Sequence, residues 1–153
     1  MGVLNETQAF RKAVLGERVD RATAALPATA AGALFTVSGG RVMIMSIIGE
    51  VTTIIQTQAN STKLTANPTT GTSVDLCSVL NISADEVGCL YGITGTAATA
   101  LVGANAGAIP GQLQNPVVNT GTIDLNCAAT NTGSVKWTLC YVPIDDGAAV
   151  VAA

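Results

Sequence analysis

The clearest pattern in this sequence is a strict alternation of apolar and polar residues near its C-terminal end. Over residues 135–141 every second side chain is apolar, and lysine, threonine and cysteine stand between them. Successive side chains of a strand point to opposite faces, so this spacing predicts a strand with one apolar face. We expect that face to lie in the core. It consists of Val135, Trp137, Leu139 and Tyr141.

The residues before this strand predict its partner. Residues 122–128 form a second β-rich run, and the turn-forming residues 131–134 lie between the two runs. Turn residues between two such runs favour a hairpin. With a two-residue turn at Gly133 and Ser134, Cys127 would lie directly opposite Cys140.

Further β-rich runs occupy the middle of the chain. Residues 34–37 and 41–48 flank a Ser-Gly-Gly turn that predicts a hairpin, and Gly49 predicts a bend or bulge before residues 50–58. Residues 72–80 fit a strand or a short helix, 90–94 a short strand, and the Ala- and Gly-rich residues 97–114 a long contact loop. About six to nine short strands separated by turns indicate a mainly β fold, an antiparallel β-sandwich or barrel of the jelly-roll type.

The N-terminal residues follow a helical period. Asn5 with Gln8 three positions later predicts a helix start and Pro27 an end, so we expect a helix over residues 5–26. Its apolar residues divide between two nearly opposite faces. The helix therefore either packs on its own domain or forms an arm between neighbouring molecules. The residues assigned to partner contacts are Leu4, Phe10, Val14, Leu15, Val19 and Leu26.

These elements predict four segments in the chain. They are an N-terminal helical arm (1–27), a linker of small residues (28–32), a β-rich body (33–143) and a C-terminal tail (144–153). The arm is denser in charge than the body: residues 1–21 carry four basic and three acidic groups, whereas residues 22–153 carry three basic and seven acidic groups. Two segments of such different composition are expected to have different surroundings.

The low charge content changes the functional expectation. Charged residues make up 11% of the chain and hydrophobic residues 48%, whereas soluble domains carry about 25% charged residues. Because neutral surfaces tend to associate, we expect much of this surface to contact other subunits of a homo-oligomer. The longest uncharged apolar run, residues 42–49, is too short to cross a bilayer as a helix, so no membrane partner is expected. A body without a basic patch makes nucleic acid an unexpected partner as well.

The composition also argues against catalysis. The chain contains no histidine, which removes the commonest general base and metal ligand. The adjacent carboxylates Asp85 and Glu86, and Asp145 and Asp146, stand among turn residues, where solvated carboxylates are ordinary. The spacing of the four cysteines matches no zinc motif. We therefore expect a protein that is not an enzyme and that has no cofactor or metal site.

The cysteines bear on the compartment. The first residues lack the basic and apolar regions of a secretory signal, so we expect folding in a cytoplasm, with Cys77, Cys89, Cys127 and Cys140 as reduced thiols.

Several runs together resemble small virion proteins of tailed bacteriophages that infect actinobacteria. These runs are LFTVSGGRV at 34–42, GEVT at 49–52, KLTANPTTG at 63–71, LYGITG at 90–95 and KWTLCYVP at 136–143. The resemblance covers most of residues 25–153. It implies a structural protein of the virion, assembled in the host cytoplasm, that decorates or cements the head as a trimer bound to the major capsid protein or other virion subunits. Residues 1–26 would fasten it to the shell.

Two alternative functions remain open. Within a virion, the chain could be a tail, fibre or head-to-tail connector subunit. It could also be a carbohydrate-binding β module that helps a phage hold its host, although such sites usually present exposed aromatic platforms and only 3% of these residues are aromatic.

Overall fold

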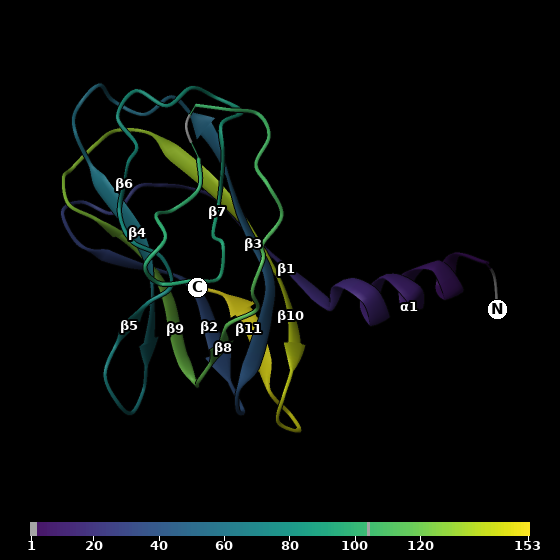
Figure 1. The fold of residues 1–153 in the computed structure, drawn as a ribbon. Coiled ribbons are helices and arrows are strands. Elements are labelled where there is room, and N and C mark those ends of the chain that lie inside the picture. Colours follow the sequence, from purple (N-terminus) through teal and green to yellow (C-terminus); the bar gives the residue numbers. More distant parts are fainter. Residues whose placement is uncertain (1–2, 104) are drawn as a thin grey trace.

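The protein is an antiparallel β-sandwich with one projecting helix (Figure 1). The computed structural model describes residues 3–103 and 105–153, and the side chains of the helix from Thr7 onward. Of the helices in these residues, none has the length and apolarity needed to cross a membrane. In the described residues both sheets end in edge strands, so the sandwich prediction is confirmed and a closed barrel is excluded.

The helix and the two sheets have the following bounds. Helix α1 spans Val3–Leu15. The first sheet has the order β1 (Glu17–Ala25), β10 (Ser134–Pro143), β3 (Val42–Thr53) and β7 (Leu90–Gly92), with β8 (Val117–Val118) also on β3. The second has the order β11 (Ala149–Ala152), β2 (Ala31–Ser38), β9 (Gly121–Cys127), β4 (Ser61–Pro68) and β5 (Val74–Asp75), with β6 (Leu80–Asn81) also on β4.

The strand order is that of a jelly roll. Early strands pair with late ones in a nested series: β1 with β10, β2 with β9, β3 with β7 and β4 with β5. The chain therefore crosses between the sheets after β1, β2 and β3, as in other double-sheet jelly rolls. Most ladder contacts consequently join residues that are far apart in the sequence.

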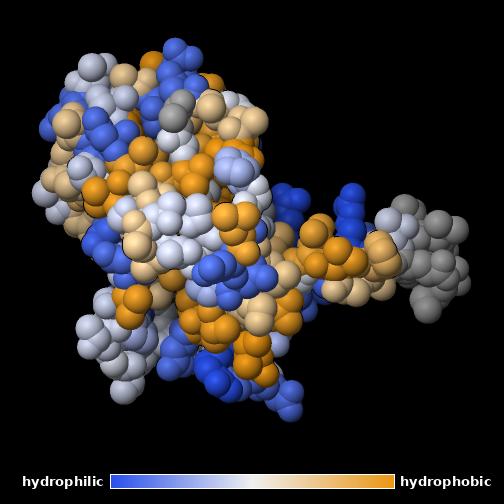
Figure 2. All heavy atoms as spheres, in the orientation of Figure 1, coloured by the Kyte–Doolittle hydropathy of each residue, from blue (hydrophilic) through white to orange (hydrophobic). Residues whose placement is uncertain are grey.

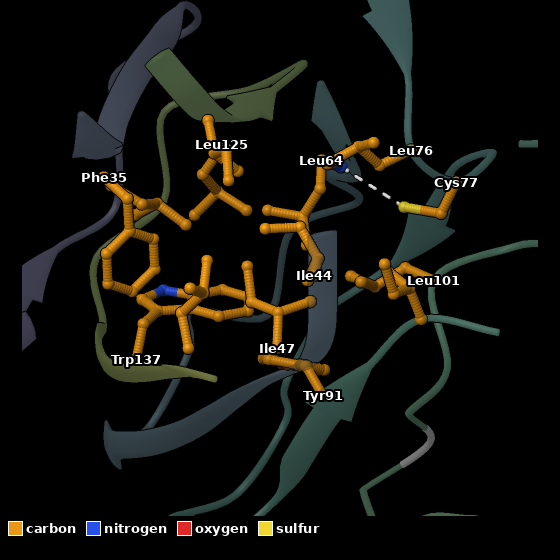
Figure 3. Close-up of a cluster of buried hydrophobic side chains, with 14 of the residues drawn as sticks. Phe35, Ile44, Ile47, Leu64, Leu76, Cys77, Tyr91, Leu101, Leu125 and Trp137 are labelled. Carbon is orange, nitrogen blue, oxygen red and sulfur yellow. Dashed lines mark hydrogen bonds between the residues drawn. The ribbon is translucent and has the colours of Figure 1, made fainter. Parts of the chain in front are cut away.

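The core fills the space between the two sheets (Figure 3). The four residues predicted on the inner face of β10 are all buried. The rings of Trp137 and Tyr91 lie 6.4 Å apart and are roughly parallel, and Phe35 of β2 packs into the core from the second sheet. Near the opposite end of the core, the Leu64 amide donates a hydrogen bond to the Sγ atom of Cys77, 3.3 Å away.

Both hairpins predicted from turn residues are wrong. Strands β2 and β3 flank the Ser-Gly-Gly turn but lie in different sheets, and so do β9 and β10. Cys127 consequently faces Thr62 of β4, whereas Cys140 lies between Arg18 and Ser46 in the other sheet. The glycines of these connections have positive φ values, as the predicted turns require, but they carry the chain across the sandwich.

The predicted arm of residues 1–27 is also wrong in its extent. Helix α1 begins at Val3 and ends at Leu15, because Gly16 adopts φ +80° and its amide donates to the Lys12 carbonyl, a common helix C-cap. Residues Glu17–Ala25 form edge strand β1 on β10. Val19 packs against the core and Leu26 is buried, so neither belongs to a free arm.

The predicted linker and tail belong to the sandwich. β2 begins at Ala31, inside the expected linker 28–32, and Ala149–Ala152 of the expected tail forms β11 on the edge of β2. Residues 97–114 contain no long element within the described part, but the carbonyls of Val102 and Ala106 accept hydrogen bonds from β7. This loop therefore covers the edge of the first sheet.

Candidate functional site

The outer faces of the two sheets differ in chemistry. The outward positions of β4 and β9 in the second sheet are polar: they are Ser61, Lys63, Thr65, Asn67, Thr122, Asp124 and Asn126. Their side chains form a hydrogen-bonded network in which Lys63 binds Asp75 at 2.7 Å and Asn126 donates to Thr65 at 2.7 Å. The hydrogen bond from Lys63 is the main reason that the pKa of Asp75 lies below its usual value. These two strands have the composition of a solvent-facing sheet, although Val151 of β11 is an exposed apolar residue on the same face.

The outer face of the first sheet is apolar over much of its surface. Val142, Met43 and Val117 lie in register on β10, β3 and β8, and Ile48 is exposed further along β3. The face also carries charged pairs: Lys136 with Glu50 across the central strands β10 and β3, and Arg18 with Asp20 on edge strand β1. A sheet face exposed only to water would normally carry polar residues at these positions. This face is therefore a candidate interaction surface.

Helix α1 extends this surface beyond the body. In Figure 2 apolar atoms gather on the projecting helix and at the lower end of the body. Phe10 exposes 70% of its surface and Val14 54%, and Leu15 is exposed as well. Helices as short as α1 are only marginally stable in water when isolated. We therefore expect α1 to need a covering partner.

A groove with a volume of about 600 Å³ lies between α1 and the first sheet. Leu15 contributes to it from the helix and Ile48 and Cys140 from the sheet. The position of α1 beside the sheet depends on Gly16, because a Cβ atom at that residue would collide with the carbonyl group of Tyr141. Three basic residues, Arg11, Lys12 and Arg18, also line it. The groove thus has a floor in which Ile48 and Cys140 lie beside the polar Ser46 and Thr138, and it has positively charged margins.

The charged margins are partly neutralised within the chain. Lys12 lies 3.6 Å from Glu17 and Arg18 2.9 Å from Asp20. The pKa of Asp20 is lowered, first by a hydrogen bond from Thr138 and then by Arg18. Arg11 has no ion pair among the described side chains. Among the side chains that the structure describes, Arg11 is therefore the groove's positive charge without an ion-pair partner.

The adjacent carboxylates Asp85 and Glu86 have different surroundings. Asp85 is buried and accepts a hydrogen bond from Tyr91 at 2.5 Å, whereas the adjacent Glu86 is exposed. Desolvation, followed by this hydrogen bond, raises the pKa of Tyr91. Burial likewise raises the pKa values of Cys77, Cys89 and Cys127. No cluster of three potential metal-binding residues occurs in the part of the chain that the structure describes.

The predicted contact residues fall into three groups. Phe10, Val14 and Leu15 share the exposed helix, Val19 and Leu26 belong to the body, and the Leu4 side chain lies outside the described residues. The prediction missed the outer face of the first sheet. The apolar residues Met43 and Val117 could have pointed to it, but only the ladder register brings them together.

Comparison of the chain with protein-family models, curated proteins and solved structures finds no match.

Proposed function

We propose that this protein is a structural subunit of a tailed-bacteriophage particle, a capsid decoration or minor capsid protein. It assembles with copies of itself, as a trimer, in the host cytoplasm and attaches to the major capsid protein or another virion subunit. The carrying observation is the apolar row of Val142, Met43 and Val117 on the outer face of the first sheet, together with the exposed apolar residues of α1. The face with this row contacts other subunits, and the outer face of the second sheet faces solvent.

The fold is compatible with this role. Jelly rolls recur in viral capsid proteins, but also in lectin domains, so the fold alone does not choose between them. The low charge content supports subunit packing, since 11% charged residues leave little to keep copies apart.

A carbohydrate-binding role is disfavoured by where the aromatic residues lie. Sugar sites usually stack a ring on an exposed aromatic side chain, yet Phe35, Tyr91, Trp137 and Tyr141 are all buried. Phe10 is the exposed aromatic residue, and it projects from a helix and not from the wall of a pocket. The exposed aromatic surface therefore fits a protein contact better than a sugar contact.

Immunogold labelling of intact particles tests the proposed location. Antibodies raised against the purified chain are expected to decorate heads in negative-stain electron microscopy. Label at the tail would instead support a tail, fibre or connector subunit. Particles without label, from a lysate in which the protein is detected, would contradict a virion role.

A truncation tests the attachment surface. Removing Met1–Leu15 deletes α1 and retains β1, whereas a longer truncation to Leu26 would also remove the edge strand and unpack the body. The shorter variant should remain folded but fail to co-sediment with heads that lack the protein. A full-length Phe10→Ser, Val14→Ser variant provides the matched control for helix length. Undiminished binding by both variants would exclude α1 as the attachment site.

A further inference from the structure

The turn between β10 and β11 carries exposed apolar side chains and an exposed carboxylate, which complement the apolar and basic residues of the groove. Ile144 exposes 42% of its surface, and Asp146 is exposed beside it. Val142 and Pro143, at the end of β10, are exposed as well. This turn, residues 142–146, therefore presents apolar side chains followed by a carboxylate.

Arg41 holds this turn in one conformation. Asp145 accepts hydrogen bonds from the Arg41 amide at 2.8 Å and from its guanidinium at 2.9 and 2.7 Å, and the Ile144 amide donates to the Arg41 carbonyl. A bidentate pair of this kind has a well-defined geometry. Arg41 also neutralises Asp145, so Asp146 remains the uncompensated charge of the turn.

The turn does not fill the groove of its own molecule, since residues 142–146 are absent from the groove lining. We infer that the occupant of the α1 groove is the 142–146 turn of a second copy. Ile144 of one copy packs against Leu15 and Ile48 of the next, and Asp146 faces Arg11. The inference rests on the proposed function and names the contact through which copies assemble.

Charge complementarity selects this occupant. The groove keeps one positive charge, on Arg11, and the turn one negative charge, on Asp146. Groove and turn are different surfaces of one molecule. A head-to-tail contact between them generates a ring when the rotation between copies closes, whereas a reciprocal contact generates a two-fold dimer. A closed ring of three would be the expected trimer.

The loop at Glu86 and Val87 is the competing occupant. Val87 exposes 63% of its surface and Glu86 is also exposed. It offers one apolar side chain, where the 142–146 turn offers Val142, Pro143 and Ile144. It also lacks the bidentate ion pair that orders that turn. Preorganised surfaces lose less entropy on binding, so the 142–146 turn is favoured.

Charge reversal in the purified full-length chain tests the contact, with self-association measured by sedimentation velocity. Asp146→Lys and Arg11→Glu should each weaken self-association about tenfold, since each places like charges together. The double variant restores opposite charges and should return to within about threefold of the parent protein. Ile144→Ser should weaken association by a similar factor without changing the charge. All three positions are exposed, so the variants are expected to fold.

Glu86→Lys is the matched control and should leave self-association unchanged. A monomeric parent protein, an Asp146→Lys variant that associates normally, or an equal loss in Glu86→Lys would each overturn the inference. Binding to heads is measured separately. If the protein binds heads normally but Asp146→Lys does not change self-association, this contact alone is wrong. If self-association responds to the charge changes but the protein does not bind heads, the proposed function alone is wrong.

Discussion

Gly49 lies directly opposite Trp137 in the β3–β10 ladder, and a Cβ atom on Gly49 would approach the indole ring to 2.8 Å. The indole thus occupies the space that a side chain on β3 would need, and it reaches towards Tyr91 on the far side of the same strand. The glycine was expected to mark a bend or bulge. The bulges of this ladder lie instead near Ser134 and Cys140, and Gly49 makes room for the largest core residue.

Gly49→Ala is therefore expected to destabilise the fold. Inserting a methyl group into a packed core typically costs about 1–3 kcal/mol of unfolding free energy. Urea denaturation followed by tryptophan fluorescence measures the change. Gly107→Ala is the control, because a Cβ atom on Gly107 has no neighbour within 4 Å. Equal stability of the two variants would show that the indole can move aside.

Gly16→Ala should disrupt the connection between α1 and β1. A Cβ atom at position 16 collides with the Tyr141 carbonyl, and the alanine must also adopt the positive φ of Gly16. Trypsin should then cleave faster after Arg11 and Lys12, which the helix otherwise protects in part. Gly147→Ala has a similar positive φ but open space around its Cβ position, so it isolates the conformational cost, about 1 kcal/mol. Equal cleavage rates at Arg11 in both variants would argue against the collision.

Acid should weaken the protein partly through Asp145. The hydrogen bond from the Arg41 side chain is the main reason that the pKa of Asp145 lies far below its usual value. A carboxylate with a depressed folded-state pKa stabilises the fold above its unfolded pKa, about 3.9, and this contribution is lost as the pH falls further. Asp145→Asn should therefore be less stable than the parent at pH 6, and the difference should shrink towards pH 2.

Urea unfolding at several pH values measures this difference. Asp146→Asn serves as the comparison, since Asp146 has no ion pair among the described side chains. A stability difference for Asp145→Asn that is constant from pH 6 to pH 2 would refute the assignment to Arg41.

The thiols should differ in reactivity. Cys77, Cys89 and Cys127 are buried and burial raises their pKa values, whereas Cys140 is partly exposed on the outer face of the first sheet. A charged disulfide reagent at pH 8 should modify Cys140 first and the others only on the timescale of unfolding. Mild oxidation should not join Cys127 to Cys140, because these residues lie in different sheets. Peptide mapping under non-reducing conditions detects either result.

Much of the local structure follows from neighbouring residues. The alternation over 135–141 identifies β10 and its buried face without any tertiary information, because a strand places successive side chains on opposite faces. Helical periodicity also predicts a helix through Phe10, Val14 and Leu15, with Leu15 on the face opposite the other two, and the structure has a helix there. The helix end was missed at Gly16, where a glycine after a helical run is itself a stop signal.

The pairing of the strands cannot be predicted from neighbouring residues. Turn residues at 38–40 and 131–134 predict that the chain reverses, and it does, but they do not state which sheet the next strand joins. In the jelly roll β1 pairs with β10, although most of the sequence lies between them. No local pattern in either strand predicts this pairing.

The residues alone therefore determine a β-rich, weakly charged chain with a separate helix, because composition and side-chain periodicity are properties of short segments. The surface proposed for subunit contacts depends on tertiary structure. Met43, Val117 and Val142 become one apolar row through the ladder register, and Arg41 holds the 142–146 turn through a contact across about 100 residues. Such surfaces depend on which distant segments the folded chain brings together.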